Sequence, residues 1–299
     1  LRRNFDPDKQ FLFFVDDSLA GNRDYMRELL EGLISEKMVP KMGWHSQMRA
    51  DVATDPSLVK LMAKTNCAFA TFGFESINPK TLKSLQKGQT PESIQRCVSR
   101  MHDEKILVNG FFMLGSDFDT KESIQATWEF ALKSGCVIAG FMPLTPFPGT
   151  GLFKEMESEG RIFIKDWELY DVQHVVYWPR NMSPSELYLG CLKAYQQFYR
   201  RWARPGLLRH MPLNRMLTTP NAIVGGSWPF IKLGAYYKEL FANRDYIRML
   251  KRIEQEREKG REVPVQKPFN TASPYHDLLT SRREKALFAE GLHLMGAIA

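Results

Sequence analysis

Polar, ionisable or small residues follow each of five apolar, β-rich runs in the first 150 residues. In parallel α/β proteins, ligands bind where the carboxyl ends of the strands meet. Charged groups at such places are costly to bury alone, so we expect them to pair with one another or with a ligand. The residues at these run ends are Asp16 and Asp17, Gln47 and Arg49, Glu75 and Ser76, Gly115, and Thr145 and Pro146.

The charged members of this set suit a small ligand that carries both charges. Arg49 and Glu75 follow neighbouring predicted strands and can form an ion pair. Such a pair can also hold a zwitterionic amino acid by its carboxylate and its ammonium. Asp16 and Asp17 have two interpretations of equal weight: one caps the next helix while the other is solvated, or one binds a ligand. Because adjacent strand residues point to opposite faces, at most one of them faces the ligand side.

The apolar runs that must position these residues repeat at about 30 residues, the size of a βα unit. Between them, apolar residues recur at helical spacing, as in Met26, Leu29, Leu30 and Leu33. This alternation predicts an α/β fold with a parallel sheet, either open and doubly wound or curved into a barrel. The predicted strands span residues 11–17, 42–49, 67–76, 106–115 and 136–145.

Cap chemistry marks several helix starts, because a short polar side chain followed by proline suits the first turn of a helix. Ser183 with Glu186, and Asp119 with Glu122, also have the spacing of a capping box. The pairs that fit the first pattern are Asp55-Pro56, Asn78-Pro79, Thr90-Pro91 and Ser183-Pro184.

The pattern changes after residue 150, and the sequence predicts three parts. Residues 1–160 form the βα part. Residues 161–204 hold an irregular aromatic stretch and a helix, and they complete it. Residues 205–299 form a basic, mainly helical extension. Within it, residues 251–261 are almost purely charged, so we expect a solvated helix or linker in a loosely attached tail.

The positive charge of the chain is concentrated in its last third. Residues 200–299 carry 18 Lys and Arg against 9 Asp and Glu, whereas residues 1–199 carry 23 against 25. Such an excess can attract phosphate, nucleic acid or an anionic membrane surface. We favour the simpler interpretation, a solvated basic extension.

Composition excludes several classes of protein. With 43% apolar residues among 299, the chain can bury a sizeable core, which excludes global disorder. The four cysteines lie 30, 39 and 55 residues apart and form no C-x-x-C pair, so we expect small buried groups and no metal site. They are Cys67, Cys97, Cys136 and Cys191.

Two further features bear on location and metal binding. No apolar run reaches the roughly 18–20 residues of a membrane-spanning helix, and no secretory signal is visible, which favours the cytoplasm. His45, His102 and His174 lack regular metal-ligand spacing, so we expect them to be structural or surface residues.

Five segments, in their order and spacing, carry a resemblance to a known family. Together they resemble the barrel of radical S-adenosylmethionine (radical SAM) proteins. They are most similar to the branch that usually carries an N-terminal cobalamin-binding domain. The segments are F-F-V-D-D-S from residue 13, W-H-S-Q-M-R-A-D from 44, F-G-F-E-S-I-N-P-K-T-L from 72, F-F-M-L-G-S-D from 111 and P-L-T-P-F-P-G-T-x-L-F from 143.

The resemblance implies a partial (βα)6 barrel of which strands two to six are visible here, followed by the helical extension. Asp16 or Asp17 would contact the methionyl ammonium of S-adenosylmethionine. Gly115 would contribute backbone contacts to adenine, and Thr145 and Pro146 would line the substrate cavity. The residues that would contact the methionyl carboxylate or the ribose are Gln47, Arg49, Glu75 and Ser76.

This sequence departs from the family pattern in two places. The C-x-x-x-C-x-x-C loop that holds the [4Fe–4S] cluster is absent, so we expect the cluster ligands to precede this chain in a larger enzyme and the chain alone to be inactive. The residues Ser116-Asp117-x-Asp119-Thr120 replace a Gly-x-Pro-x-Glu-Thr pattern, which affects the adenine side.

By this resemblance, the intact enzyme would cleave S-adenosylmethionine to a 5′-deoxyadenosyl radical and methylate or rearrange an unactivated carbon of a small molecule. Its cofactors would be S-adenosylmethionine, a [4Fe–4S] cluster and cobalamin, with flavodoxin or ferredoxin as electron donor. Two alternatives are open. One is a barrel enzyme of ordinary polar chemistry that uses Asp17, Arg49 and Glu75. The other is a clusterless binding module whose basic tail contacts a partner, lipid or nucleic acid.

Overall fold

Five parallel strands form one sheet in the order in which they occur in the chain. The computed structural model describes residues 4–200 and 243–261. Each strand pairs with the next one along the sequence, so the strand order never reverses, and the doubly wound alternative is wrong. The strands are β1 (Leu12–Phe14), β2 (Trp44–Met48), β3 (Cys67–Glu75), β4 (Leu107–Leu114) and β5 (Ile138–Pro143).

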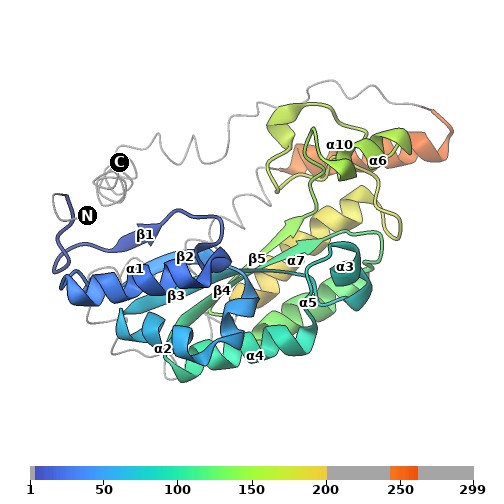
Figure 1. Cartoon of the computed structure of the whole chain (residues 1–299). Helices are drawn as coiled ribbons and strands as arrows, with labels where there is room; N and C mark the ends of the chain where they lie inside the picture. Colours follow the sequence, from blue (N-terminus) through green and yellow to red (C-terminus); the bar gives the residue numbers. More distant parts are fainter. Residues whose placement is uncertain (1–3, 201–242, 262–299) are drawn as a thin grey trace.

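The connecting helices pack side by side along one face of the sheet (Figure 1). We call this helix-covered side the outer face and the opposite side the inner face. This layer consists of α1, α2, α4, α5 and α7, whereas α6 and α10 lie in a separate lobe. The described helices are α1 (Arg23–Ser35), α2 (Pro56–Lys64), α3 (Pro79–Ser84), α4 (Pro91–Asp103), α5 (Lys121–Ser134), α6 (Gly151–Ser158), α7 (Pro184–Arg200) and α10 (Arg244–Glu258). The 3₁₀ turns are η1 (Leu19–Gly21), η2 (Ala50–Thr54) and η3 (Trp167–Leu169).

Aromatic side chains on the outer face form the centre of the core. Trp44, Phe72, Phe112 and Phe141 are fully buried there. The Phe112 and Phe141 rings stack across β4 and β5 with their centroids 5.7 Å apart. Burying one such ring contributes about 2–3 kcal/mol, so this row of rings is a major source of the fold's stability.

The predicted caps are confirmed, with one correction. Asp55, Asn78 and Thr90 each accept a hydrogen bond from a backbone N–H of the following helix. The Ser183 and Glu186 side chains exchange hydrogen bonds with each other's backbone N–H, as a capping box requires. Asp119 and Glu122, however, do not start α5.

The capping box of α5 consists of Thr120 and Ser123, one residue later than the spacing of Asp119 and Glu122 indicates. Asp119 is buried and turns back toward the end of β4, where it accepts hydrogen bonds from two backbone N–H groups. Because Asp119 is used elsewhere, the hydroxyl groups of Thr120 and Ser123 form the capping box.

Helix α7 covers the free edge of β5. The Tyr199 hydroxyl donates to the Ala139 carbonyl at 2.9 Å and accepts from the Ala139 N–H at 3.2 Å. Both backbone groups of an edge residue are thereby satisfied within the chain. Residues 184–200 thus complete the layer of helices beside the sheet.

Helix α10 is docked, which corrects the expected loose tail for residues 243–261. Tyr246 and Leu250 are buried against the rest of the chain, and the Tyr246 hydroxyl donates to the Val175 carbonyl at 2.7 Å. The Glu254 carboxylate accepts from the Ser185 N–H at 2.7 Å and from its hydroxyl at 2.9 Å. The rest of the predicted extension lies outside the described residues.

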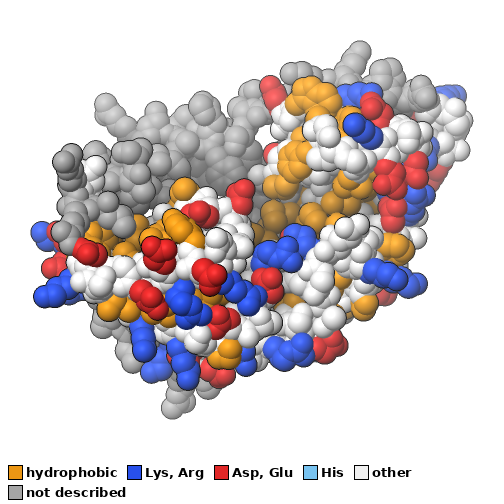
Figure 2. Space-filling model, viewed as in Figure 1, with side chains coloured by type: hydrophobic (Ala, Val, Ile, Leu, Met, Phe, Trp, Pro, Cys, Tyr) orange, Lys and Arg blue, Asp and Glu red, His pale blue; other side chains and the backbone are white. Residues whose placement is uncertain are grey.

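The described surface carries charged side chains of both signs, whereas hydrophobic side chains gather in the hollow beside the lobe that holds α6 and α10 (Figure 2). None of the described helices has both the length and the apolar character needed to span a membrane.

Candidate functional site

The end of β1 presents two carboxylates and one buried hydroxyl. Asp16 and Asp17 are exposed, and neither has a hydrogen-bond or ion-pair partner among the described residues. Neither caps a helix, because Ser18 precedes η1 and Asn22 caps α1. The Ser18 hydroxyl oxygen is buried without a hydrogen-bond partner. This edge of the sheet therefore holds hydrogen-bonding groups that the described chain leaves unused.

The end of β2 lies next to the end of β1. Gln47 is exposed and pairs in register with Thr71 of β3. Arg49 is also exposed, and its Nε atom lies 3.7 Å from an Asp51 carboxylate oxygen. An exposed pair at this distance contributes little stability, so the Arg49 guanidinium can turn to a ligand.

Glu75, at the end of β3, adopts an unusual backbone conformation. Its φ is 63°, the left-handed region, and the register with β4 shifts just before it. Its carboxylate folds back over Gly73, where a Cβ atom would lie 2.7 Å from Glu75 Oε1. Lys87 Nζ lies 2.9 Å from the same oxygen. The ion pair predicted between Glu75 and Arg49 is wrong, because Glu75 pairs with Lys87 instead.

Two polar residues flank Glu75. Ser76 is buried, and its hydroxyl accepts from the Asn78 N–H at 3.0 Å, which fixes the start of α3. Gln89 donates from its amide nitrogen to the Gly73 carbonyl at 3.2 Å, while its own carbonyl oxygen is buried without a partner. Gln89 and Lys87 come from the α3–α4 connection, and no spacing rule links them to the strand end.

The β4–α5 loop is held at nearly every backbone polar group. Gly115 has a φ of 95°, and its N–H donates to Asp119 at 3.0 Å. Its carbonyl accepts from the Tyr177 hydroxyl at 2.5 Å. Burial raises the pKa of Tyr177 well above its usual value, so this hydroxyl stays protonated. Of the Gly115 backbone groups, only the second lone pair of the carbonyl is left for a ligand.

An ion-pair cluster fixes the same loop from the other side. Burial alone would raise the pKa of Asp117, but hydrogen bonds from Arg161 and Arg180 hold it below its ordinary value. Arg161 reaches the two Asp117 oxygens at 2.6 and 3.2 Å, and Arg180 reaches one of them at 2.7 Å. Both arginines also bond to Glu159. No sequence pattern indicates this cluster, because its members lie up to 63 residues apart.

At the end of β5, Thr145 and Pro146 are buried. The Thr145 hydroxyl donates to the Pro143 carbonyl at 3.3 Å, so it serves a local turn. Phe147, which follows, is 45% exposed between two prolines. A large apolar ring held in a rigid turn at this edge is available for contact with a ligand or another domain.

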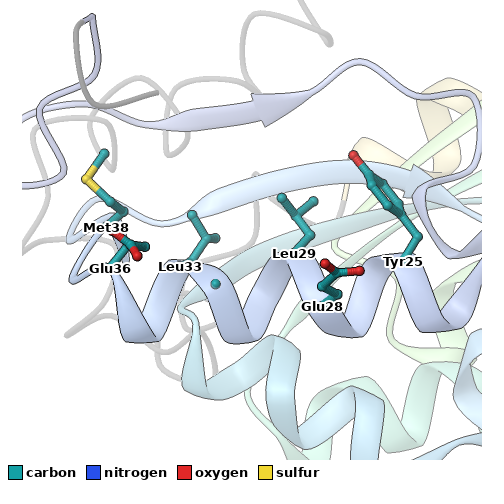
Figure 3. Close-up of a pocket in the computed structure, with 7 residues that line it drawn as sticks. Tyr25, Glu28, Leu29, Leu33, Glu36 and Met38 are labelled. Carbon is teal, nitrogen blue, oxygen red and sulfur yellow. The ribbon is translucent and has the colours of Figure 1, made fainter.

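A pocket of about 350 Å³ lies along α1, away from these strand ends. Figure 3 shows Tyr25, Leu29 and Leu33 pointing from the helix toward the side on which β1 runs. The lining of this pocket is mainly apolar and comes from α1 and from Glu36 and Met38 after it, without the converging polar groups of a catalytic site. We therefore assign the candidate site to the strand ends.

Comparison with known proteins identifies the family. No family model matches the chain. The bacteriochlorophyllide d C-12(1)-methyltransferase of Chlorobaculum tepidum is 33% identical over 204 residues, which are 67% of this chain and 43% of that protein. The anaerobic magnesium-protoporphyrin IX monomethyl ester cyclase of Cereibacter sphaeroides is 25% identical over 75% of this chain and 36% of that protein. The chain belongs to the cobalamin-dependent branch of the radical SAM superfamily.

Among solved structures, the radical SAM methyltransferase TsrM from Kitasatospora setae, with cobalamin and a [4Fe–4S] cluster bound, aligns with a TM-score of 0.46 and 18% identity. The alignment covers 50% of this chain and 30% of that one. The chain spans less than half the length of the two curated radical SAM relatives described above.

The described cysteines do not fit the iron–sulfur cluster of a radical SAM enzyme. All four are buried, none forms a disulfide bond, and no two of them lie on the same helix or strand. Burial raises the pKa of the Cys97 and Cys191 thiols, which disfavours the thiolate form that binds iron. Among the described residues, no three His, Cys, Asp or Glu side chains are grouped so as to hold a metal ion.

Proposed function

We propose that this chain forms the S-adenosylmethionine-binding part of a cobalamin-dependent radical enzyme that methylates or rearranges an unactivated carbon of a small molecule. The five strands would be strands two to six of a partial (βα)6 barrel, and the rest of the enzyme would supply the cluster ligands and the cobalamin-binding domain. The observation that carries this proposal is the set of unpaired acceptors at the ends of β1 and β3. They are the Asp16 and Asp17 carboxylates, the Ser18 hydroxyl oxygen and the Gln89 carbonyl oxygen.

These acceptors fit the donor groups of S-adenosylmethionine. An ammonium and two ribose hydroxyls need carboxylate, hydroxyl or amide oxygens, and the two strand ends are separated only by β2. Asp16 or Asp17 would accept from the ammonium. Glu75, held by Lys87, would accept from the ribose or stabilise the ammonium.

Other strand-end residues would complete the binding site. Arg49 would bind the methionyl carboxylate, and Gln47 would add a neutral amide beside it. Ser76 keeps the Glu75 turn in place through its bond to Asn78. Gly115 would offer adenine its remaining carbonyl lone pair. Thr145 and Pro146 would form the wall next to the substrate rather than bond to it.

When bound at a reduced cluster, S-adenosylmethionine would supply a 5′-deoxyadenosyl radical, with the electron coming from a flavodoxin or ferredoxin. The described cysteines do not fit the cluster, so its ligands would come from the rest of the enzyme. The contribution of these residues is to bind and orient the cofactor and to exclude water.

Binding measurements on the complete gene product that contains these residues test the proposal. After anaerobic reconstitution, Arg49→Ala and Glu75→Ala should each weaken S-adenosylmethionine binding about tenfold, because each removes a charged partner. Asp103→Ala, an exposed carboxylate at the end of α4, should bind as the wild type does. If Arg49→Ala and Glu75→Ala both bind S-adenosylmethionine as tightly as the wild type does, the assignment of these strand-end residues is wrong. Enzymatic activity without iron would support a barrel enzyme of ordinary polar chemistry instead.

A further inference from the structure

Three side chains form a continuous hydrogen-bonded row on the inner face of the sheet. His45 Nε2 lies 2.8 Å from Thr71 Oγ1, and Asn109 Nδ2 donates to the same oxygen at 3.1 Å. The residues come from β2, β3 and β4, and the register places Thr71 directly beside Asn109. We call these residues the inner-face row. They lie within the strands rather than at the strand ends described above.

The direction of the hydrogen bonds in the row follows from proton counting. Thr71 is only 3% exposed and has one hydroxyl hydrogen. If both neighbours donated to its oxygen, that hydrogen would have no described acceptor. Asn109 therefore donates to Thr71, Thr71 donates to His45 Nε2, and the ring proton of neutral His45 is on Nδ1.

The surroundings of the row keep it uncharged. The His45 ring is stacked between Phe13 and Phe69, with centroids 4.8 and 4.2 Å away. Burial lowers the pKa of His45 to about 4, so the ring is neutral at pH 7. His45 is thus a neutral ring stacked on two aromatic rings, and Thr71 and Asn109 carry no charge.

The row contains one buried acceptor without a partner. Asn109 Oδ1 is buried, and no hydrogen bond reaches it. Buried acceptors in folded proteins are almost always paired, and an orphan of this kind indicates a ligand, a water molecule or a local function. Each end of the row has an unused hydrogen-bonding atom: Asn109 Oδ1 can accept, and His45 Nδ1, which has no described partner, can donate.

We propose that the inner-face row is a binding site for an uncharged hydroxyl or N–H group of a small ligand, which donates to Asn109 Oδ1. The apolar part of the ligand would contact the aromatic rings beside the row, as in ligand pockets that combine a few fixed polar groups with apolar walls. This assignment does not rest on the proposed radical chemistry. In such an enzyme, the row would anchor a neutral group of the substrate away from the cofactor at the strand ends.

A matched set of small aromatic probes tests the charge preference on the 299-residue chain. Benzyl alcohol is a neutral donor, benzoate an anion, benzylammonium a cation, and toluene lacks a donor. We expect benzyl alcohol to shift the NMR signals of the Asn109 side-chain amide and the His45 ring nitrogens in a saturable manner. Benzoate and toluene should bind at least about tenfold more weakly, because neither can donate to Oδ1.

Variants separate this site from nonspecific binding. Asn109→Leu should abolish saturable binding of benzyl alcohol, whereas Gln125→Leu, exposed on α5, should leave it unchanged. Asn109→Asp keeps the acceptor and adds a negative charge, so the binding preference of this variant should move to benzylammonium. Asn109→Asp tests the same site if Asn109→Leu does not fold. Equal shifts from all four probes, or unchanged binding in a folded Asn109→Leu chain, would overturn the proposal. So would an ordered water at Oδ1 that benzyl alcohol does not displace.

Discussion

Arg161 and Asp117 form a bidentate ion pair in which the guanidinium is almost fully buried, with a side-chain exposure of 9%. The same guanidinium donates through Nε to the Trp178 carbonyl at 2.9 Å and lies over the Tyr177 ring. Tyr177 in turn holds the carbonyl of Gly115. One side chain thus connects the β4–α5 loop to the segment that follows α6, so the strand-end loop is rigid.

Arg161→Met should destabilise the chain strongly, because it leaves Asp117 and Glu159 with one cationic partner instead of two. The loss of a buried pair of this kind costs about 3 kcal/mol. Urea unfolding measures it as a lower midpoint at an unchanged slope. The control is Lys165→Met, which removes the exposed pair with Glu157 and should change stability by less than about 1 kcal/mol. Equal effects of the two variants would contradict a central role for Arg161.

Substitutions at two glycines with positive φ distinguish the energetic cost of backbone strain from the cost of a steric collision. Gly115→Ala and Gly149→Ala both place a side chain at a positive φ, 95° and 86°, which costs about 1 kcal/mol. Only at Gly115 would the new methyl group collide with Leu187 and the Tyr177 hydroxyl, which adds about 1–3 kcal/mol. Gly115→Ala should therefore be clearly the less stable variant in thermal unfolding. Similar melting temperatures would show that Leu187 and Tyr177 move aside at little cost.

Much of the fold could be predicted from the sequence, because strand burial and helix starts are local signals. All five strands lie inside their predicted ranges. The first is shorter than predicted, since residues 15–17 are exposed beyond the short pairing with β2. The misplaced capping box at Asp119 shows the limit: the spacing was right, but burial and two backbone N–H groups decide where that carboxylate points.

The strand ends that carry the candidate residues could be predicted, but the side-chain partners of these residues could not. The strand ends were correctly located, because each follows an apolar run. The partner of Glu75 could not be identified, since Lys87 comes from a loop, whereas Arg49 follows the neighbouring predicted strand. Likewise, no periodicity indicates that Asn109 bonds to Thr71, 38 residues earlier. Such contacts depend on register and on side-chain directions that only the folded chain defines.

His45 should make stability depend on pH in a defined window. Its pKa is lowered from 6.5 to about 4 in the folded chain, mainly by burial, so the unfolded chain binds the proton more readily. The resulting contribution to stability is present above pH 6.5 and is lost as the pH falls toward 4. His45→Phe, which keeps an aromatic ring between Phe13 and Phe69, should flatten the stability profile between these values. NMR titration of the ring should give a midpoint near 4; a midpoint near 6.5 would mean that the ring is solvated.

The contact between Glu254 and Ser185 should control how tightly α10 is held. The Glu254 carboxylate accepts from the backbone N–H and the hydroxyl in the first turn of α7, where a negative charge is stabilised by the helix dipole. Glu254→Ala leaves a buried N–H unpaired, so local opening of α10 and of the α7 start should become about tenfold more frequent. Amide hydrogen exchange measures this directly in residues 185–188 and 244–258. Glu258→Ala, on the exposed side of α10, is the matched control and should leave exchange unchanged. If both variants exchange like the wild type, the apolar contacts of Tyr246 and Leu250 hold the helix without the carboxylate.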